Sequence, residues 1–287
     1  MRQILPERRA AGFTLIEMVV VMTITGILVA IVAVFIQRPM EGLMDTTRRA
    51  ALADTADTAL RRMRRDVQRS LPNSVRFTTV GTTSIIEFLP TVTGGRYCIE
   101  PGTTVAGVKC TVLDFTNAVG SFDYIGPLPG WGTGAVTAAE VVVYNLGIPG
   151  ADAYAGDNTA TFSAINTTSS TVSFTPSKQF PYPSPGNRFQ VIGGPVSYVC
   201  SATSNGQDGT GTLVRVSGYA KQATQPTAPA SLSGAVSNVL ATNVFQCDID
   251  YAQAVVDQYG MLSMTLGVQR KGEKVVLTHE MQINNAP

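Results

Sequence analysis

The sequence predicts an α+β protein, in which a long N-terminal helix packs through its second half on an antiparallel β-sheet domain. Three observations predict this layout: an apolar run over residues 13–36, an amphipathic pattern over residues 37–71, and short β-type runs separated by turn residues from residue 72 onward. We therefore expect four segments. They are a leader over residues 1–12, a membrane helix over 13–36, an amphipathic helix over 37–71 and a β-rich domain over 72–287.

Composition narrows the possible classes of protein. Hydrophobic residues make up 44% of the 287 residues, which is too many for a disordered chain. Charged residues make up only 14%, and the formal net charge is +1. Because affinity for phosphate needs clustered cations, we expect no nucleic-acid partner.

The apolar run is long enough to cross a membrane. Residues 13–36 carry one charge, Glu17, and as a helix they would span roughly 36 Å at 1.5 Å per residue. A secretory signal peptide has a shorter apolar region and a small-residue cleavage site after it, so we expect this run to stay on the mature protein. Arg2, Arg8 and Arg9 precede the run and predict that residues 1–12 face the cytoplasm. The rest of the chain would then lie outside the inner membrane.

Glu17 is the most informative residue of this segment. A carboxylate in an apolar helix is costly to insert, although a position at headgroup depth would leave it solvated. The string Gly12-Phe13-Thr14-Leu15-Ile16-Glu17 resembles the signature of type IV pilins. The resemblance implies that a prepilin peptidase cuts after Gly12, that the new N-terminal Phe13 is N-methylated, and that Glu17 is needed for assembly. Cleavage would create an α-amino group in an apolar environment, and Glu17 of an adjacent subunit could pair with it.

The second half of the predicted helix is amphipathic. We expect Pro39 and Gly42 to bend the helix, and the segment Leu71-Pro72-Asn73 to end it. The apolar face is formed by residues at three- and four-residue steps, namely Leu52, Ala56, Ala59, Leu60, Met63, Val67 and Leu71. The opposite face carries Arg48, Arg49, Arg61, Arg62, Arg65 and Arg69.

Two ion pairs are expected within this helix, Asp57 with Arg61 and Asp45 with Arg49. Two interpretations of the arginine face remain open. It is a solvated helix surface, or it contacts another subunit or anionic lipid headgroups.

The remainder reads as one antiparallel β-rich domain. The predicted strands are Val75–Val80, Ser84–Leu89, Glu140–Asn145, Thr171–Thr175, Arg188–Ile192, Val196–Cys200, Thr212–Val216, Met261–Gln269 and Lys274–Ile283. Hairpin turns are expected at residues 80–83 and 269–273, and loops at residues 145–170, 177–187 and 221–237.

Four cysteines follow the membrane helix. We expect Cys98 to pair with Cys110 across a short loop and Cys200 to pair with Cys247, in an oxidising periplasm. Four cysteines allow three connectivities, and the sequence leaves the other two open. A zinc site is disfavoured, because there is no C-x-x-C spacing and the chain has one histidine.

Signals for enzyme chemistry are poor, and we expect no catalytic site, no metal and no cofactor. His279, the single histidine, lies in a strand pattern. Asp248 and Asp250 could share a strand face, where solvated acids are more usual than an acid–base pair. The oxygen-rich stretch of residues 204–211 does not have the EF-hand pattern, which favours a hairpin turn over a calcium site.

Later segments sharpen the resemblance. The strings ALADTADTALRRMRRDVQRSLPNSVR, LDFTNAVGSFDYIGPLPG, VVVYNLGIPGADAY, GGPVSYVC and LTHEMQINNAP resemble the MshO subfamily of minor pilins, which belongs to the mannose-sensitive haemagglutinin (MSHA) type IV pilus. The resemblance implies a role in assembly or initiation, near the filament tip. Expected partners are major and minor pilins, prepilin peptidase, the assembly platform and the inner membrane. A type II secretion minor pseudopilin, a tip-displayed adhesin and a membrane-anchored periplasmic enzyme are the alternatives.

Overall fold

A computed structural model describes residues 12–100, 104–105, 108–128, 140–253 and 259–287 of the chain. The leader predicted over residues 1–12 therefore lies outside the described residues, except for Gly12. The chain forms two compact units, residues 1–50 and residues 51–287. We call the second unit the head and treat each unit by itself. Helix α1 (Leu15–Val67) belongs to both units, because the boundary falls within it.

In the first unit, α1 is helical from Leu15 without a break. Residues 15–35 form an apolar span of mean hydropathy 2.8, and none of it is buried. The helix also continues through Pro39 and Gly42, so neither residue ends it. The bend that we expect near these two residues stays a prediction.

In the head, α1 packs through the face that its periodicity predicts. All seven apolar positions of that face, from Leu52 to Leu71, are buried. The helix ends at Val67, four residues before the predicted end at Leu71, and residues 68–70 continue as hydrogen-bonded turns. Asp57 pairs with Arg61 at 2.7 Å, as predicted. In the first unit, Asp45 pairs with Arg48 at 2.8 Å, so the prediction of Arg49 as its partner is wrong.

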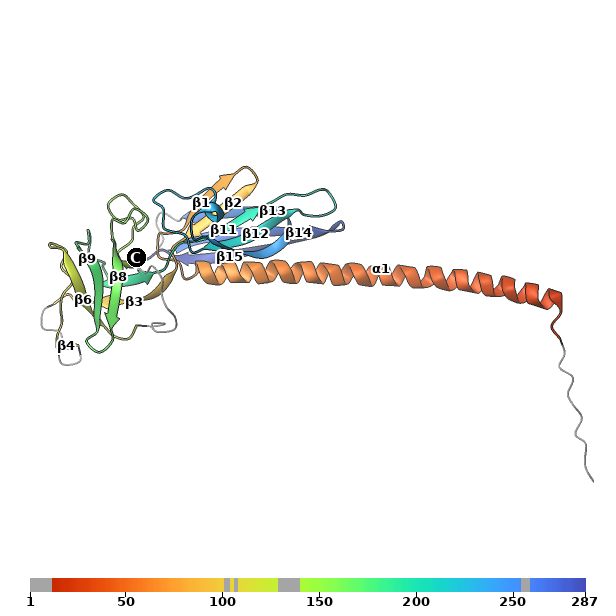
Figure 1. The fold of residues 1–287 in the computed structure, drawn as a ribbon, viewed down its shortest axis with the longest axis horizontal. Coiled ribbons are helices and arrows are strands. Elements are labelled where there is room, and N and C mark those ends of the chain that lie inside the picture. Colours follow the sequence, from red (N-terminus) through yellow and green to blue (C-terminus); the bar gives the residue numbers. More distant parts are fainter. Residues whose placement is uncertain (1–11, 101–103, 106–107, 129–139, 254–258) are drawn as a thin grey trace, which may run out of the picture. The chain divides into compact units, whose positions relative to one another are not determined.

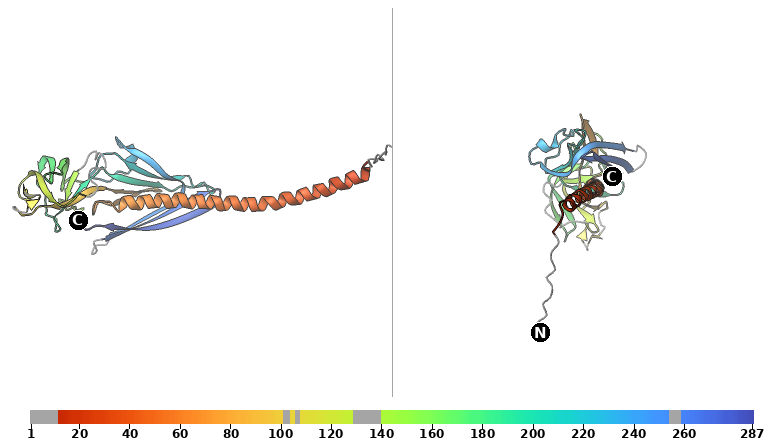
Figure 2. Two further views of the ribbon diagram at one scale, coloured as in Figure 1. Left: turned by 90° about the horizontal axis from the view of Figure 1, so that it is seen from below. Right: turned by 90° about the vertical axis from the view of Figure 1, so that its right-hand side faces the viewer.

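A seven-stranded antiparallel sheet covers this part of the helix (Figure 1). Its strands, in spatial order, are β1 (Arg76–Val80), β2 (Thr83–Phe88), β11 (Val196–Ser201), β12 (Gly211–Ser217), β13 (Val236–Gln253), β14 (Tyr259–Arg270) and β15 (Glu273–Asn284). The main core of the head contains the apolar face of α1 together with side chains from β2 and from β11 to β15. Because both ends of the sheet order contribute to one core, the sheet wraps around the helix, as Figure 2 shows.

Strand β13 makes this wrapping possible because its two halves pair with different neighbours. Residues 236–244 pair with β12, whereas residues 244–253 pair with β14. Register shifts interrupt both pairings near Val244, and Asn243 adopts a φ of 60°. At this corner β12 passes so close that a Cβ atom on Gly211 would overlap the carbonyl oxygens of Ser201 and Val244. Only glycine fits there without a shift of the backbone.

A closed β-barrel forms the other part of the head. Its order is β10 (Arg188–Ile192), β3 (Thr91–Tyr97), β6 (Val119–Ile125), β9 (Thr171–Lys178), β8 (Thr159–Asn166) and β7 (Glu140–Val143). The interior is filled by aromatic and β-branched side chains, among them Tyr97, Phe122, Phe174, Phe180 and Phe189. Two further short strands, β4 (Thr104–Val105) and β5 (Val108–Lys109), pair with each other. A 3₁₀ turn (Pro229–Ser231) lies in the loop before β13.

All nine predicted strands are present, with ends that differ by a few residues. The structure adds β3, β4, β5, β6, β8 and β13, and with them a second core. Strand β8 shows that the loop predicted over residues 145–170 is wrong for residues 159–166. A small apolar cluster that includes Leu71, Leu89 and Tyr154 joins the barrel to the sheet.

Candidate assembly site

The N-terminal motif lies where α1 begins. Gly12 and Phe13 precede the helix, and the side chain of Phe13 is 77% exposed. Thr14 occupies the N-cap position, because the hydroxyl of Thr14 accepts a hydrogen bond from the amide of Glu17 at 3.4 Å. Thr14 and Glu17 have the spacing of a capping box, which places the Glu17 carboxylate in the first helical turn.

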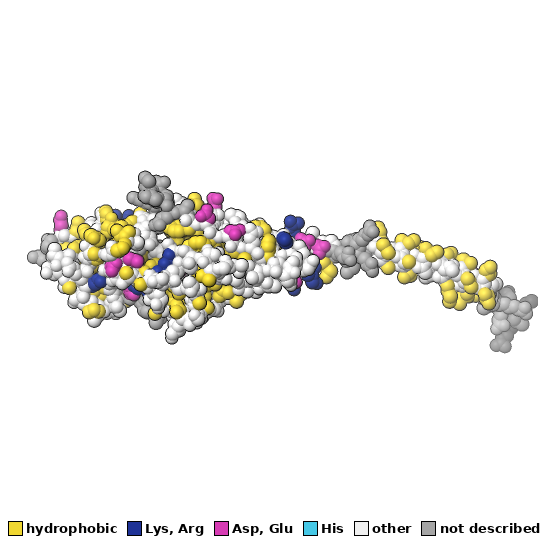
Figure 3. All heavy atoms as spheres, turned by 90° about the horizontal axis from the view of Figure 1, so that it is seen from above, with side chains coloured by type: hydrophobic (Ala, Val, Ile, Leu, Met, Phe, Trp, Pro, Cys, Tyr) yellow, Lys and Arg dark blue, Asp and Glu magenta, His cyan; other side chains and the backbone are white. Residues whose placement is uncertain are grey.

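Glu17 is therefore positioned by the helix itself. An anion in the first turn interacts favourably with the positive end of the helix dipole. Glu17 is exposed and is the one charged residue between Leu15 and Phe35. Figure 3 shows hydrophobic side chains along this outer part of the helix. Such a surface becomes stable only in lipid or against other apolar helices.

In the head, the partly buried carboxylate of Asp66 ties α1 to the sheet. The hydroxyl of Tyr198 on β11 donates to Asp66 Oδ2 at 2.8 Å, and Arg215 Nε on β12 donates to the same oxygen at 2.8 Å. Burial and the adjacent Asp66 charge raise the pKa of Tyr198, so this phenol stays a donor at neutral pH. Neither Tyr198 nor Arg215 could be linked to Asp66 from the sequence, because the three residues lie far apart in the chain.

A buried cluster fixes the loop that follows β12. Glu87 on β2 is fully buried and accepts from Arg76 Nε at 2.9 Å and from the Tyr219 hydroxyl at 3.0 Å. Ser197 Oγ lies 2.6 Å from the same phenol oxygen, and the Arg76 guanidinium lies 3.5 Å from the ring centre of Tyr154. Burial raises the pKa of Glu87 above its ordinary value, and hydrogen bonding and charge from Arg76 oppose that rise.

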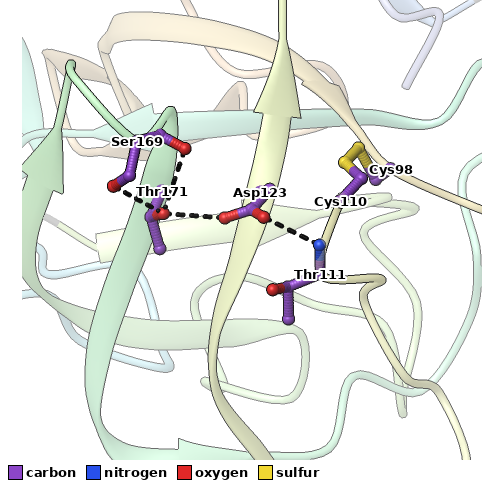
Figure 4. The surroundings of a disulfide bond; sticks show 6 residues. All are labelled: Cys98, Cys110, Thr111, Asp123, Ser169 and Thr171. Carbon is purple, nitrogen blue, oxygen red and sulfur yellow. Dashed lines mark hydrogen bonds between the residues drawn. A yellow bond between two sulfur atoms is a disulfide. The ribbon is translucent and has the colours of Figure 1, made fainter. Parts of the chain in front are cut away.

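Both expected disulfides are present in the structure. Cys98 is bonded to Cys110, and Cys200 is bonded to Cys247, with a Cα–Cα distance of 6.3 Å in each. The residue after Cys110 is anchored to the barrel through Asp123, whose Oδ2 accepts from the Thr111 amide at 2.7 Å (Figure 4). The other Asp123 oxygen accepts from the Thr171 hydroxyl at 2.7 Å.

The residues considered above for catalysis or calcium binding lie in surroundings that are typical of structural residues. His279 lies on β15 with its Nε2 3.4 Å from Asp57 Oδ1 on α1. Asp248 and Asp250 are exposed on β13. In the stretch of residues 204–211, Asn205 Oδ1 accepts from the amides of Gln207 and Asp208 at 3.0 and 2.7 Å, which is typical of a turn. Within the described residues, no three His, Cys, Asp or Glu side chains are grouped so that they could hold a metal ion.

Comparison with known proteins identifies the class of the N-terminal segment. Residues 8–33 match the family described as "Prokaryotic N-terminal methylation motif". Searches of curated proteins and of solved structures found no significant match. The chain thus carries a prepilin-type N-terminal methylation motif on a pilin-like α+β layout, and it is a type IV pilin-like or pseudopilin-like protein. Proteins of this class are typically structural and non-enzymatic.

Proposed function

We propose that this protein is a minor pilin of an MSHA-type type IV pilus, of the MshO subfamily, that acts in pilus assembly or initiation near the filament tip. The observation that carries the proposal is the methylation motif at the start of an exposed apolar helix that leads into a disulfide-bonded head. The subfamily strings of the sequence support the pilus over a type II secretion pseudopilin, which is the alternative.

In this proposal, prepilin peptidase cuts between Gly12 and Phe13, and the new amine of Phe13 is methylated. The helix anchors the protein in the inner membrane with the head in the periplasm, until the assembly platform extracts it into the pilus. The oxidising periplasm accounts for the two disulfides. Other major and minor pilins bury the apolar helix surface in the filament.

Glu17 has a specific part in this scheme. After cleavage, the positive amine of Phe13 lies just before a helix N-terminus, where a cation is unfavourable. The Glu17 carboxylate of a neighbouring subunit offsets that charge, and the pair sets the axial register between the two helices. Either charge alone in the apolar environment is costly, so the benefit of Glu17 appears only when subunits meet.

The variant Glu17→Ala tests the proposal. Because the carboxylate is a cost to insertion, the variant should insert in the membrane at least as well as the natural protein. It should be recruited poorly to pilin complexes, while the head folds normally. Co-purification with partner minor pilins from detergent extracts, together with counts of surface pili, measures both effects. Glu17→Gln is the matched control for side-chain size. Normal recruitment and normal piliation with Glu17→Ala would show that the paired-charge mechanism is wrong.

A further inference from the structure

A groove of about 480 Å³ lies between the β1–β2 hairpin and the second half of β13. The hairpin wall is formed by Phe77, Thr79 and Ser84, and the opposite wall by residues 245–249 of β13. Phe77 is 37% exposed, which leaves part of an aromatic ring open to solvent.

The groove exposes the edge of β13. Side chains alternate between the two faces of a strand, so a strand that offers one face lines a groove with every second residue. Here five consecutive residues of β13 line the groove, which means that the strand turns its backbone edge toward it. Among the described residues, the backbone of β13 beyond Val244 pairs only with β14, and no strand pairs with its other edge. Open N–H and C=O groups on such an edge are a template for an added strand.

The position of this edge is fixed by the rest of the head. The bond between Cys200 and Cys247 holds the groove segment of β13 beside β11. The side chain of Gln246 donates to Asp248 Oδ2 at 2.7 Å, which orients the carboxylate. A preformed edge of this kind loses little entropy when a partner strand binds.

The charges of the edge decide what kind of strand it accepts. Asp248 is the one charged residue that lines the groove, and Asp250 follows it on the same exposed face. Antiparallel pairing between two copies of this edge, centred on Ile249, would place Asp248 opposite Asp250. Like charges directly opposite each other are destabilising, so a second copy of this chain is disfavoured. A strand with a Lys or Arg between apolar residues can pair with Asp248 and pack on the exposed part of the Phe77 ring.

We infer that this groove binds an extended, basic strand of a different pilin subunit by β-strand addition to residues 246–251 of β13. The identity of the partner as a pilin rests on the proposed function. The groove gives the head a recognition surface separate from the Phe13–Glu17 contact, so head and helix select neighbours independently.

Hydrogen exchange of the full-length protein in detergent micelles tests the inference with two synthetic peptides as probes. One has the sequence Thr-Val-Lys-Val-Thr-Val, and the other has Glu in place of Lys. The Lys peptide is added at a concentration ten times its Kd. The amides of residues 246–251 that are not hydrogen-bonded to β14 should then exchange about tenfold more slowly. The Glu peptide should bind about fivefold more weakly, because it places like charges opposite each other.

The variant Asp248→Lys should reverse this preference, so that the Glu peptide binds more tightly than the Lys peptide. Glu280→Lys, an exposed charge change on β15, is the matched control and should keep the natural preference. Protection by neither peptide, equal protection by both, or an Asp248→Lys variant that still prefers Lys would overturn the inference. A dimer of the unliganded protein in light scattering, with the same amides protected, would assign the edge to a second copy instead.

This test is separate from that of the proposed function. It uses no pili, and Glu17 takes no part in it. A failure of peptide binding removes the docking groove and leaves the assembly role of Glu17 standing. Normal assembly of Glu17→Ala would instead remove the paired-charge mechanism and leave the peptide result unchanged.

Discussion

Cys200 of β11 is bonded to Cys247 of β13, although β12 lies between these two strands in the order of the sheet. The bond is possible because β12 pairs with β13 only up to Val244. Beyond that residue β13 turns back toward β11, and the disulfide joins the two parts of the sheet that enclose α1. The disulfide therefore limits how far these two parts of the sheet can separate, and the helix is held between them.

The two disulfides should contribute unequally to stability. The bond between Cys200 and Cys247 spans 47 residues and that between Cys98 and Cys110 spans 12. Because loop-closure entropy grows with the length of the loop, the longer bridge should stabilise by about 4 kcal/mol and the shorter by about 3 kcal/mol. Urea unfolding of the double variants Cys200→Ser/Cys247→Ser and Cys98→Ser/Cys110→Ser, in a fragment that begins at Ala51, measures the difference.

Non-reducing peptide mapping of the natural protein should recover these two pairs and no others. A crosslink between Cys98 and Cys200, or free thiols at all four positions, would contradict the disulfide framework.

Processing should leave a mature chain that begins with methylated Phe13. Residues 1–12 carry three Arg and one Glu, a charge of +2, so cleavage changes the net charge from +1 to −1. Mass spectrometry of the membrane-bound protein, from cells with and without an active prepilin peptidase, should show the two forms. A chain that keeps Met1 in cells with active peptidase would show that the cleavage prediction is wrong.

Met63→Asp should destabilise the head severely. Met63 is fully buried in the main core beneath the sheet, and an unpaired charge there has no partner. A loss of at least about 3 kcal/mol is expected, enough to unfold or aggregate many domains. Thr58→Asp, on an exposed position of the same helix, should change the unfolding midpoint little. The urea midpoints of the two variants are measured by circular dichroism and compared. Similar midpoints would contradict the packing of the apolar face of α1.

Glu87 should make stability depend on pH in the acid range. Its pKa in the folded protein is raised above 4.5 by burial, so below pH 4.5 the carboxyl is protonated in both states. As the pH rises toward the folded pKa, the unfolded chain loses this proton while the folded protein keeps it. The contribution of Glu87 to stability therefore falls by up to about 1.4 kcal/mol per pH unit within that window.

Glu87→Gln removes this titration and should flatten the pH profile of the unfolding free energy above pH 4.5, where the folded carboxyl still holds its proton. Glu280→Gln, an exposed carboxyl on β15, should leave the profile as it is. Identical slopes for the natural protein and Glu87→Gln would mean that burial does not shift this carboxyl.

Local sequence patterns predicted the helix and nine of the strands because their signals lie close together in the chain. Apolar residues from Leu52 to Val67 recur with the period of a helix, and these residues form its buried face. Strand β7 contains a compact apolar run, Val141–Val143. In contrast, β3 contains Gly94 and Gly95, and β6 contains Gly120, which weaken the strand pattern. In β13, apolar and polar residues alternate over residues 245–251, but residues 236–244 show no such alternation. Tertiary pairing overrides weak propensity at these strands.

The sequence by itself determined the segment that defines the class of this protein: Gly12, Phe13, Glu17 and the apolar helix after them. These residues act through composition and spacing along one helix, so no distant contact is needed to recognise them. Only the tertiary structure decided the barrel, the corner in β13, the open edge beside Asp248 and the meeting of Asp66 with Tyr198 and Arg215. Those features depend on which distant strands pair and where pairing stops, and the free energy that decides this comes from packing between segments far apart in the chain.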